Sequence, residues 1–264
     1  MSGLEALAGM DYPGRFIALG LTQNGMPVAV YGITGRSPPS QARRLVERQN
    51  IHPLLPEINV IMVEPTDEKL LAQGDRSLLI YPAMMFGDTV LEEGMLIERS
   101  ISVSNGAQTN EVHFTSGARD PIAALLQAHR QWKYESDPNY TPRISGKIVR
   151  LSGADCQAAL GIIKRTPEGT VDRHYFEVPL TPGRGRFIST YSGENQNPLP
   201  SFRGEPLSVE IRGVSPEVIA RELYDALEGI DDNDFRVSVV AAILLPDGSY
   251  QSAIVNRHGN GGSA

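Results

Sequence analysis

Hydrophobic residues in this chain gather in short runs that are separated by polar turns. Runs of this kind are typical of strands buried in a sheet. The first two, Arg15–Gly20 and Val28–Ile33, flank Asn24-Gly25, a dipeptide that favours a hairpin turn. We expect further strands over residues 58–63, 77–81, 96–103, 144–151, 161–164, 174–178, 185–191, 236–245 and 250–255.

Two segments carry helix signals. Pro121–Trp132 follows Asp120, which can cap a helix, and Ser215–Leu227 begins with a capping serine and a proline. The apolar stripe of the second helix would be Val218, Ile219, Leu223 and Leu227. Residues 36–48 are expected to be a loop that passes into a short helix or strand.

Strands outnumber helices, and hairpins join successive strands, so the pattern predicts an α+β fold with mostly antiparallel sheets. We see no internal repeat and no clear linker. The sequence therefore predicts a single domain over residues 1–264, with flexible ends at 1–11 and 259–264.

Composition narrows the class of protein. The chain has 264 residues, 41% hydrophobic and 21% charged, which is ordinary for a soluble globular protein. A net charge of -7 argues against binding nucleic acid polymers, although a mononucleotide needs only one or two arginines. No run is long enough for a membrane span and no secretory signal is present, so we expect a cytoplasmic protein without a membrane partner. The single cysteine, Cys156, excludes an intrachain disulfide and is interpreted as a small buried residue.

Three polar motifs in the first half supply candidate chemistry. They are Y-G-I-T-G-R-S from Tyr31, N-G-A-Q-T-N from Asn105, and N-Y-T-P-R-I from Asn139. Arginines bind phosphate or carboxylate, and amides and hydroxyls bind neutral polar edges. The motifs favour a site for an anionic small molecule, with turn-forming and capping roles as the alternative.

Other kinds of site find little support. The chain has no phosphate-loop or dinucleotide fingerprint, and its histidines lack zinc-site spacing. Pro182–Gly185 is interpreted as a turn. His113 lies close to the Asn105 motif and could contribute a proton.

Four features together resemble the archaeal-type IMP cyclohydrolases over roughly residues 12 to 145. They are Gly14-Arg15-Phe16 before a strand, Tyr31 followed by Arg36-Ser37, Asn105-Gly106 with Thr109, and Tyr134-Glu135 through Tyr140-Thr141-Pro142-Arg143-Ile144. The resemblance implies a four-layered αββα fold similar to N-terminal-nucleophile hydrolases, and one IMP cyclohydrolase-like domain. It implies closure of the purine ribonucleotide FAICAR to inosine monophosphate with loss of water. It implies no cofactor and no metal, and it suggests a homo-oligomer.

The chain departs from the family pattern at several places. It is longer, with extra sequence near Glu64–Asp75 and at the C-terminus, and Asn110 stands where the family usually has an acidic residue. The order Asn139-Tyr140 is also reversed relative to the family. These differences leave an altered substrate open.

The reaction needs no protein nucleophile, because the substrate's carboxamide nitrogen attacks its own formyl carbon. The protein must position these groups, stabilise charge on the formyl oxygen and protonate the leaving hydroxyl. Glu135 is an alternative to Glu111 as the acid or base. The residues expected to act in catalysis are Asn105, Thr109, Glu111 and Tyr140, and those expected to bind substrate are Tyr31, Arg36, Ser37, Tyr81, Gly106, Asn110, Thr141 and Arg143.

Two other functions remain open from the sequence. An N-terminal-nucleophile amidohydrolase could use Ser2, although Ser2 precedes the first expected strand by about a dozen residues. A non-catalytic purine-nucleotide-binding protein on the same fold is the second alternative, and Asn110 is the feature that supports it.

Overall fold

Two antiparallel sheets dominate the structure, a computed structural model that describes residues 7–49, 58–91, 96–115, 120–136, 139–151, 155–228 and 233–259. The predicted predominance of antiparallel sheet is confirmed. The six-stranded sheet has the order β11 (Leu207–Glu210), β10 (Arg184–Ser189), β1 (Arg15–Leu21), β2 (Pro27–Thr34), β12 (Arg236–Leu244) and β13 (Tyr250–Asn256). The seven-stranded sheet has the order β3 (Arg43–Gln49), β4 (Asn59–Pro65), β5 (Pro82–Leu91), β6 (Leu96–Ser104), β7 (Arg143–Leu151), β8 (Gln157–Arg165) and β9 (Val171–Glu177).

The two sheets pack face to face around the main hydrophobic core. Ile17 and Tyr31 of the six-stranded sheet share this core with Phe86, Ile101 and Ile148 of the other. Every residue of β2 is buried, because it lies between β1 and β12 and is covered on both faces. This explains why the run lacks the polar alternation of a half-exposed strand.

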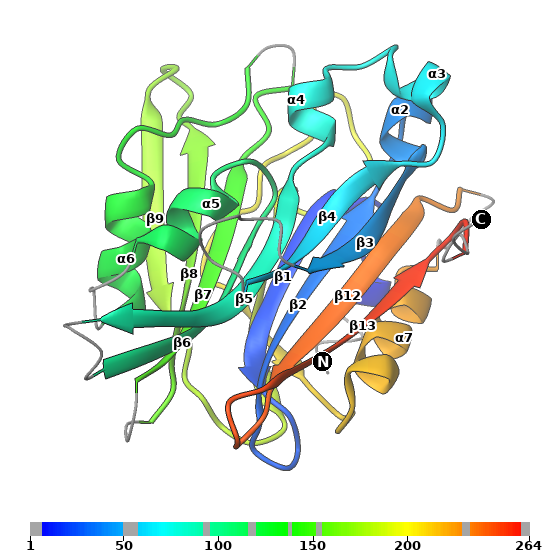
Figure 1. Cartoon of the computed structure of the whole chain (residues 1–264). Coiled ribbons are helices and arrows are strands. Elements are labelled where there is room, and N and C mark those ends of the chain that lie inside the picture. Colours follow the sequence, from blue (N-terminus) through cyan, green and yellow to red (C-terminus); the bar gives the residue numbers. More distant parts are fainter. Residues whose placement is uncertain are drawn as a thin grey trace.

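Helices cover the outer faces of both sheets (Figure 1). Helix α7 (Pro216–Ala226) packs on the six-stranded sheet, where Ile219 and Tyr224 join Val239 in a second core. Helices α5 (Thr109–Phe114) and α6 (Pro121–Ala128) pack on the outer face of the seven-stranded sheet. The short helices α2 (Pro38–Gln41), α3 (Glu68–Leu71) and α4 (Arg76–Leu79) lie together at one end of the sandwich.

The strand expected over residues 77–81 is wrong. Arg76–Leu79 forms α4, because Asp75 caps it by accepting hydrogen bonds from the nitrogen and hydroxyl of Ser77 at 2.9 and 2.7 Å. The strand begins only at Pro82, as β5. Tyr81, the last residue of the expected strand, is buried.

The helix predictions hold with two corrections. Ser215 caps α7 as expected, but the Val218 side chain is 46% exposed and so does not belong to its buried stripe. Helix α6 ends at Ala128 with His129 as its C-cap, short of the expected Trp132. Helices α3 and α5 were not expected, because each is only about one turn long and carries no periodic pattern.

Parts of the termini lie outside the described residues, namely 1–6, which include Ser2, and 260–264. Within the described part of the expected flexible N-terminus, Leu7 is buried in the core beneath α7. Across the described residues, no helix has both the length and the hydrophobicity needed to cross a bilayer.

Candidate active site

A cavity of about 470 Å³ opens at the end of the sandwich that carries α2 and α4. Its volume lies within the range usual for small-molecule sites. Distant parts of the chain meet in its wall, including the start of β1, α2 and the segment before β7. The lining residues are Tyr12, Arg15, Arg36, Ser37, Pro39, Ser40, Arg43, Gln73, Gly74, Asp75, Leu78, Leu79, Glu135, Ser136, Asn139, Thr141, Tyr191 and Leu199.

A buried ion pair forms the floor of this cavity. Arg15 Nη2 lies 2.6 Å from Glu135 Oε1, and the two side chains are only 11% and 6% exposed. Arg15 opens β1 directly after Gly14, which has φ +75° and whose position leaves no room for a Cβ beside Thr190. Burial by itself lowers the pKa of Arg15, but Glu135 and the nearby tyrosines outweigh burial and raise it well above the usual value. The pair therefore places a fixed cation and a carboxylate where solvent has little access.

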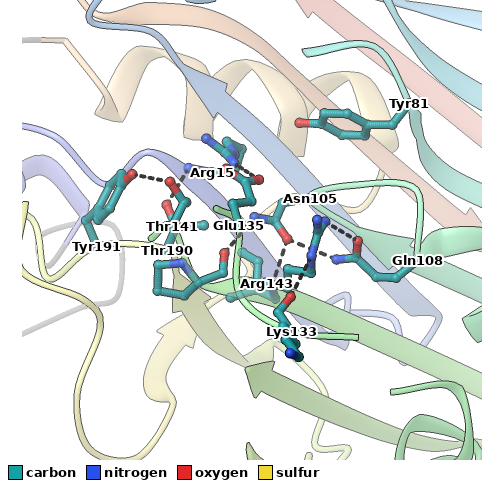
Figure 2. A network of polar contacts seen from close by, with 12 residues as sticks. Arg15, Tyr81, Asn105, Gln108, Lys133, Glu135, Thr141, Arg143, Thr190 and Tyr191 are labelled. Carbon is teal, nitrogen blue, oxygen red and sulfur yellow. Dashed lines mark hydrogen bonds and ion pairs between the residues drawn. The ribbon is translucent and has the colours of Figure 1, made fainter. Parts of the chain in front are cut away.

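Tyrosine hydroxyls surround the ion pair. The hydroxyls of Tyr31 and Tyr81 lie 2.8 Å apart, and Thr141 Oγ1 lies 2.7 Å from the Tyr191 hydroxyl. Figure 2 shows the Tyr81 hydroxyl directed toward the region of Arg15, with Thr141 and Tyr191 on the opposite side. Burial raises the pKa of Tyr31 and of Tyr191. Both phenols thus stay protonated near neutral pH and can donate hydrogen bonds.

The rim of the cavity is cationic. Arg36 is exposed, and its contacts within the described residues are neutral: Asn195 Oδ1 at 3.2 Å, the Gln196 carbonyl at 3.1 Å, and the Tyr12 ring. Arg43 is fully buried and donates from Nε to the Ser40 carbonyl at 2.8 Å. Its buried Nη1 has no hydrogen-bond partner among the described residues. A buried donor without a partner is costly unless a ligand occupies the site, so the rim suits an anion.

A second polar cluster lies beside the floor and joins β6 to β7. Asn105 Oδ1 accepts from the backbone nitrogen of Ile144 at 2.8 Å and from Gln108 Nε2 at 3.1 Å, while Nδ2 donates to the Pro142 carbonyl at 2.9 Å. Arg143 donates to Gln108 Oε1 at 3.0 Å and to the Lys133 carbonyl at 2.8 Å, and it packs on the Trp132 ring. Both side chains are thus engaged within the protein, as Figure 2 shows.

The residues expected from the sequence divide into several groups. Arg36, Ser37 and Thr141 line the cavity, and Tyr31 and Tyr81 lie buried near its floor. Asn105, Gly106, Thr109 and Arg143 belong to the cluster that joins β6 to β7; Thr109 donates to the Gly106 carbonyl at 2.8 Å. These four are absent from the described lining of the cavity.

Three other expected residues are absent from the described lining of the cavity. Asn110 is exposed on α5, and Glu111 on the same helix has a buried Oε2 without a partner among the described residues. Tyr140, at φ 47°, turns its ring against Tyr134 and the Arg165 guanidinium. The catalytic and binding roles expected for these residues stay predictions.

Some cavity residues received no role from the sequence. Arg15, Arg43, Tyr12 and Tyr191 all line it, and Glu135 was only an alternative for the acid or base. A signal existed for Arg15, because an arginine at the head of the otherwise apolar run Phe16–Leu21 is unusual for a strand buried on both faces.

Metal ligands do not gather in the described part of the chain. There, no group of three or more His, Cys, Asp or Glu side chains is placed to hold a metal ion.

Sequence comparisons extend over almost the whole chain. The chain is 24% identical to the IMP cyclohydrolase of Methanocaldococcus jannaschii over 243 residues, which cover 90% of this chain and 96% of that protein. It is 26% identical to the IMP cyclohydrolase of Methanopyrus kandleri, with 76% of this chain and 94% of that protein covered. It is 25% identical to the IMP cyclohydrolase of Methanococcus aeolicus, with 81% and 88% covered. The model of the family described as IMP cyclohydrolase-like protein matches residues 12–247, and the chain therefore belongs to this family.

Proposed function

We propose that this chain is an IMP cyclohydrolase, which closes the ring of FAICAR to give inosine monophosphate with loss of water. Family membership and three relatives that carry this name support the proposal. The structural observation that carries it is the buried Arg15–Glu135 pair at the floor of a cavity with a cationic rim.

The rim would bind the phosphate of the nucleotide. Arg36 and the unpartnered Nη1 of Arg43 offer charged donors, and Ser37 offers a hydroxyl. Arginine forks match phosphate oxygens in charge and geometry. With the phosphate at the rim, the heterocycle would extend toward Arg15 and Glu135, and its carboxamide and formamide would lie against the tyrosine hydroxyls.

In the first step, a bond forms between the carboxamide nitrogen and the formyl carbon. The carbonyl electron pair moves to the formyl oxygen, where Arg15 and a tyrosine hydroxyl would stabilise the developing charge. Glu135 would take the proton that the nitrogen loses and return it to the oxygen, which gives a neutral carbinolamine. Positioning of the two groups in one plane would lower the barrier further.

In the second step, the carbinolamine loses water. Its carbon–oxygen bond breaks as the hydroxyl accepts a proton, and the formamide nitrogen loses its own proton as the carbon–nitrogen double bond forms. Glu135 would take one proton and supply the other, and Arg15 would hold its carboxylate in place.

The cluster around Asn105 would act indirectly. Because Asn105 and Arg143 join the ends of β6 and β7, we assign them to positioning the segment that carries Glu135 and Thr141. Thr109 and Gly106 would support the same cluster. Roles for Glu111, Asn110 and Tyr140 remain as expected from the family resemblance.

Membership of this family also supports inferences about fold, location and assembly. We infer that the chain forms one domain with the layer order helix, sheet, sheet, helix, similar to N-terminal-nucleophile hydrolases. We also infer that it acts in the cytoplasm as a homo-oligomer, with a purine ribonucleotide as its substrate.

The test is incubation of the purified protein with FAICAR, with inosine monophosphate followed by chromatography against a control without enzyme. Catalytic formation of inosine monophosphate is the expected result. Thermal stabilisation by inosine monophosphate without turnover would contradict the proposal and favour a nucleotide-binding protein that has lost the chemistry. Absence of both signals would mean that the cavity does not take this nucleotide.

A further inference from the structure

A second cavity, of about 190 Å³, lies at the other end of β10 from the candidate active site. It is lined by Pro179, Thr181, Arg184, Gly185, Arg186, Ser208, Val209 and Glu210, and we name it the arginine pocket. The sequence pattern of Pro182–Gly185 indicated only a turn there. Strand β10 begins at Arg184 and leads to Tyr191 in the active-site wall, so the two cavities are about 20 Å apart at a rise of ~3.3 Å per residue.

The register of β10 and β11 gathers the polar groups on one face. Arg184 pairs with Glu210 and Arg186 pairs with Ser208 across the two strands. Alternate residues of a strand project to the same side, so both arginines share a face with Ser208 and Glu210. Gly185, between the two arginines, and Phe187, after them, are buried, and Phe187 belongs to the core beneath α7.

Arg186 is held in place by neutral groups. Its Nη1 donates to Ser208 Oγ at 2.6 Å and to the Pro206 carbonyl at 3.4 Å. Neither contact neutralises its charge. Among the described residues, the guanidinium is therefore positioned by neutral groups and forms no ion pair, an arrangement that suits an anion.

The one carboxylate in the lining already has a cation. Glu210 Oε2 accepts from Arg212 Nε at 3.2 Å and from Arg212 Nη2 at 2.9 Å. Arg184 stands directly across the strand pair from Glu210 but forms no ion pair within the described residues. The lining therefore holds two guanidinium groups and one carboxylate, and that carboxylate is paired with Arg212 outside the lining, in a chain whose net charge is -7.

We propose that the arginine pocket is a second anion site, which binds the phosphate group of inorganic phosphate or of a small phosphate monoester. Arg184 and Arg186 supply the charge, and the hydroxyls of Thr181 and Ser208 supply further hydrogen-bonding groups in the lining. The pocket is large enough for a phosphoryl group but much smaller than the active-site cavity. A larger phosphate ester would therefore leave its organic part in solvent.

The test is a calorimetric titration of the full chain with inorganic phosphate. Wild-type protein is expected to show two classes of site, one at the active-site rim and one at the arginine pocket. Arg184→Gln should weaken only the second class, by at least about tenfold, since it removes one of two charged donors. Arg36→Ala should weaken only the first class, and Arg221→Gln, which removes an exposed arginine of α7, should leave both unchanged.

The position of the ion is checked in crystals grown with phosphate. Phosphate bound between Arg184 and Arg186 is expected, and its absence at a concentration that fills the active-site rim would overturn the proposal. A titration in which Arg184→Gln binds like wild-type protein would overturn it as well. Because Arg184 is exposed, this single variant should fold even if a variant at Arg186 does not.

A parallel titration with inosine monophosphate distinguishes the two ligand sources. A second equivalent of bound nucleotide that Arg184→Gln removes would identify a site for phosphate monoesters. A second class for inorganic phosphate alone would identify a site for the free ion. The result does not depend on whether the protein turns over FAICAR, since only binding is measured.

Discussion

The described structure contains two buried ion pairs, one in the wall of a cavity and one enclosed beneath α5. Arg15–Glu135 has a separation of 2.6 Å and lines a cavity, with side chains 11% and 6% exposed. Lys147–Glu98 has a separation of 3.2 Å under α5, with side chains 0% and 1% exposed. Lys147 also donates to the carbonyls of Val112 and Thr115 at 3.0 and 3.3 Å, and these hydrogen bonds link the end of α5 to β7.

The comparison shows that burial of a charged pair does not by itself indicate a catalytic site. Burial lowers the pKa of Lys147, and Glu98 only partly opposes this effect. Nearby His113 is also fully buried, and neither of its ring nitrogens has a partner in the described part of the chain. What distinguishes the Arg15–Glu135 pair is that it lines a cavity. We therefore expect the sealed pair to govern stability and the accessible pair to govern turnover.

The largest effect is expected from Lys147→Met. It leaves the Glu98 carboxylate buried without a cation, which should lower the free energy of unfolding by about 3–5 kcal/mol. Urea denaturation measures the loss. The double variant Lys147→Met with Glu98→Leu should recover much of this loss. A double variant no more stable than the single one would show that the loss comes from the contacts of Lys147 with the α5 carbonyls and not from the unpaired Glu98.

Glu135→Gln should act on turnover. The amide keeps the size of the side chain but cannot accept and return a proton, so kcat should fall by about 10²–10³-fold. The KM for FAICAR should change much less, since the rim arginines remain. Steady-state kinetics give both constants, and a kcat within threefold of wild type would remove Glu135 from the chemistry.

His113 should make stability depend on pH. Burial, with a smaller effect of Lys147, lowers its pKa to about 3, below the ordinary value of about 6.5. Below pH ~6.5 the unfolded state therefore binds a proton at His113 while the folded state keeps this ring neutral. The contribution of His113 to the free energy of unfolding is complete above pH ~6.5 and falls by about 1.4 kcal/mol per pH unit below it. His113→Gln should remove this contribution between pH 6.5 and 5; an unchanged slope would contradict it.

The smallest effect is expected from Arg36→Ala at the exposed rim. Loss of one solvent-screened phosphate contact should raise the KM for FAICAR about fivefold to tenfold, or about 1–1.4 kcal/mol, with kcat nearly unchanged. Arg48→Ala is the matched control, because Arg48 is an exposed arginine of β3 that pairs with Glu64 of β4 and is absent from the described cavity lining. Equal KM values in the two variants would exclude Arg36 from the site.

Local signals allowed much of the fold to be predicted. Asn24-Gly25 marks a real hairpin turn, with positive φ at Gly25, and Ser215 caps α7. The error at residues 77–81 arose because the cap formed by Asp75 outweighs the strand preference of the apolar run. The sequence there contains both signals, and the cap determines the backbone of residues 76–79.

The site was less predictable, because its central contact joins residues that are 120 positions apart. Arg36, Ser37 and Thr141 were found through their motifs and do line the cavity. Asn105 and Arg143 were found in the same way, but their polar groups are engaged inside the protein. Motif chemistry identifies the polar residues of a region; which of them remain accessible depends on tertiary contacts.

A crystal structure of the protein with bound inosine monophosphate would test the central claim most directly. We expect the phosphate at Arg36 and Arg43, and the six-membered ring against Arg15 and Glu135, within hydrogen-bond distance of a tyrosine hydroxyl. A nucleotide bound in this cavity with its base away from the Arg15–Glu135 pair, or bound elsewhere on the protein, would contradict the account.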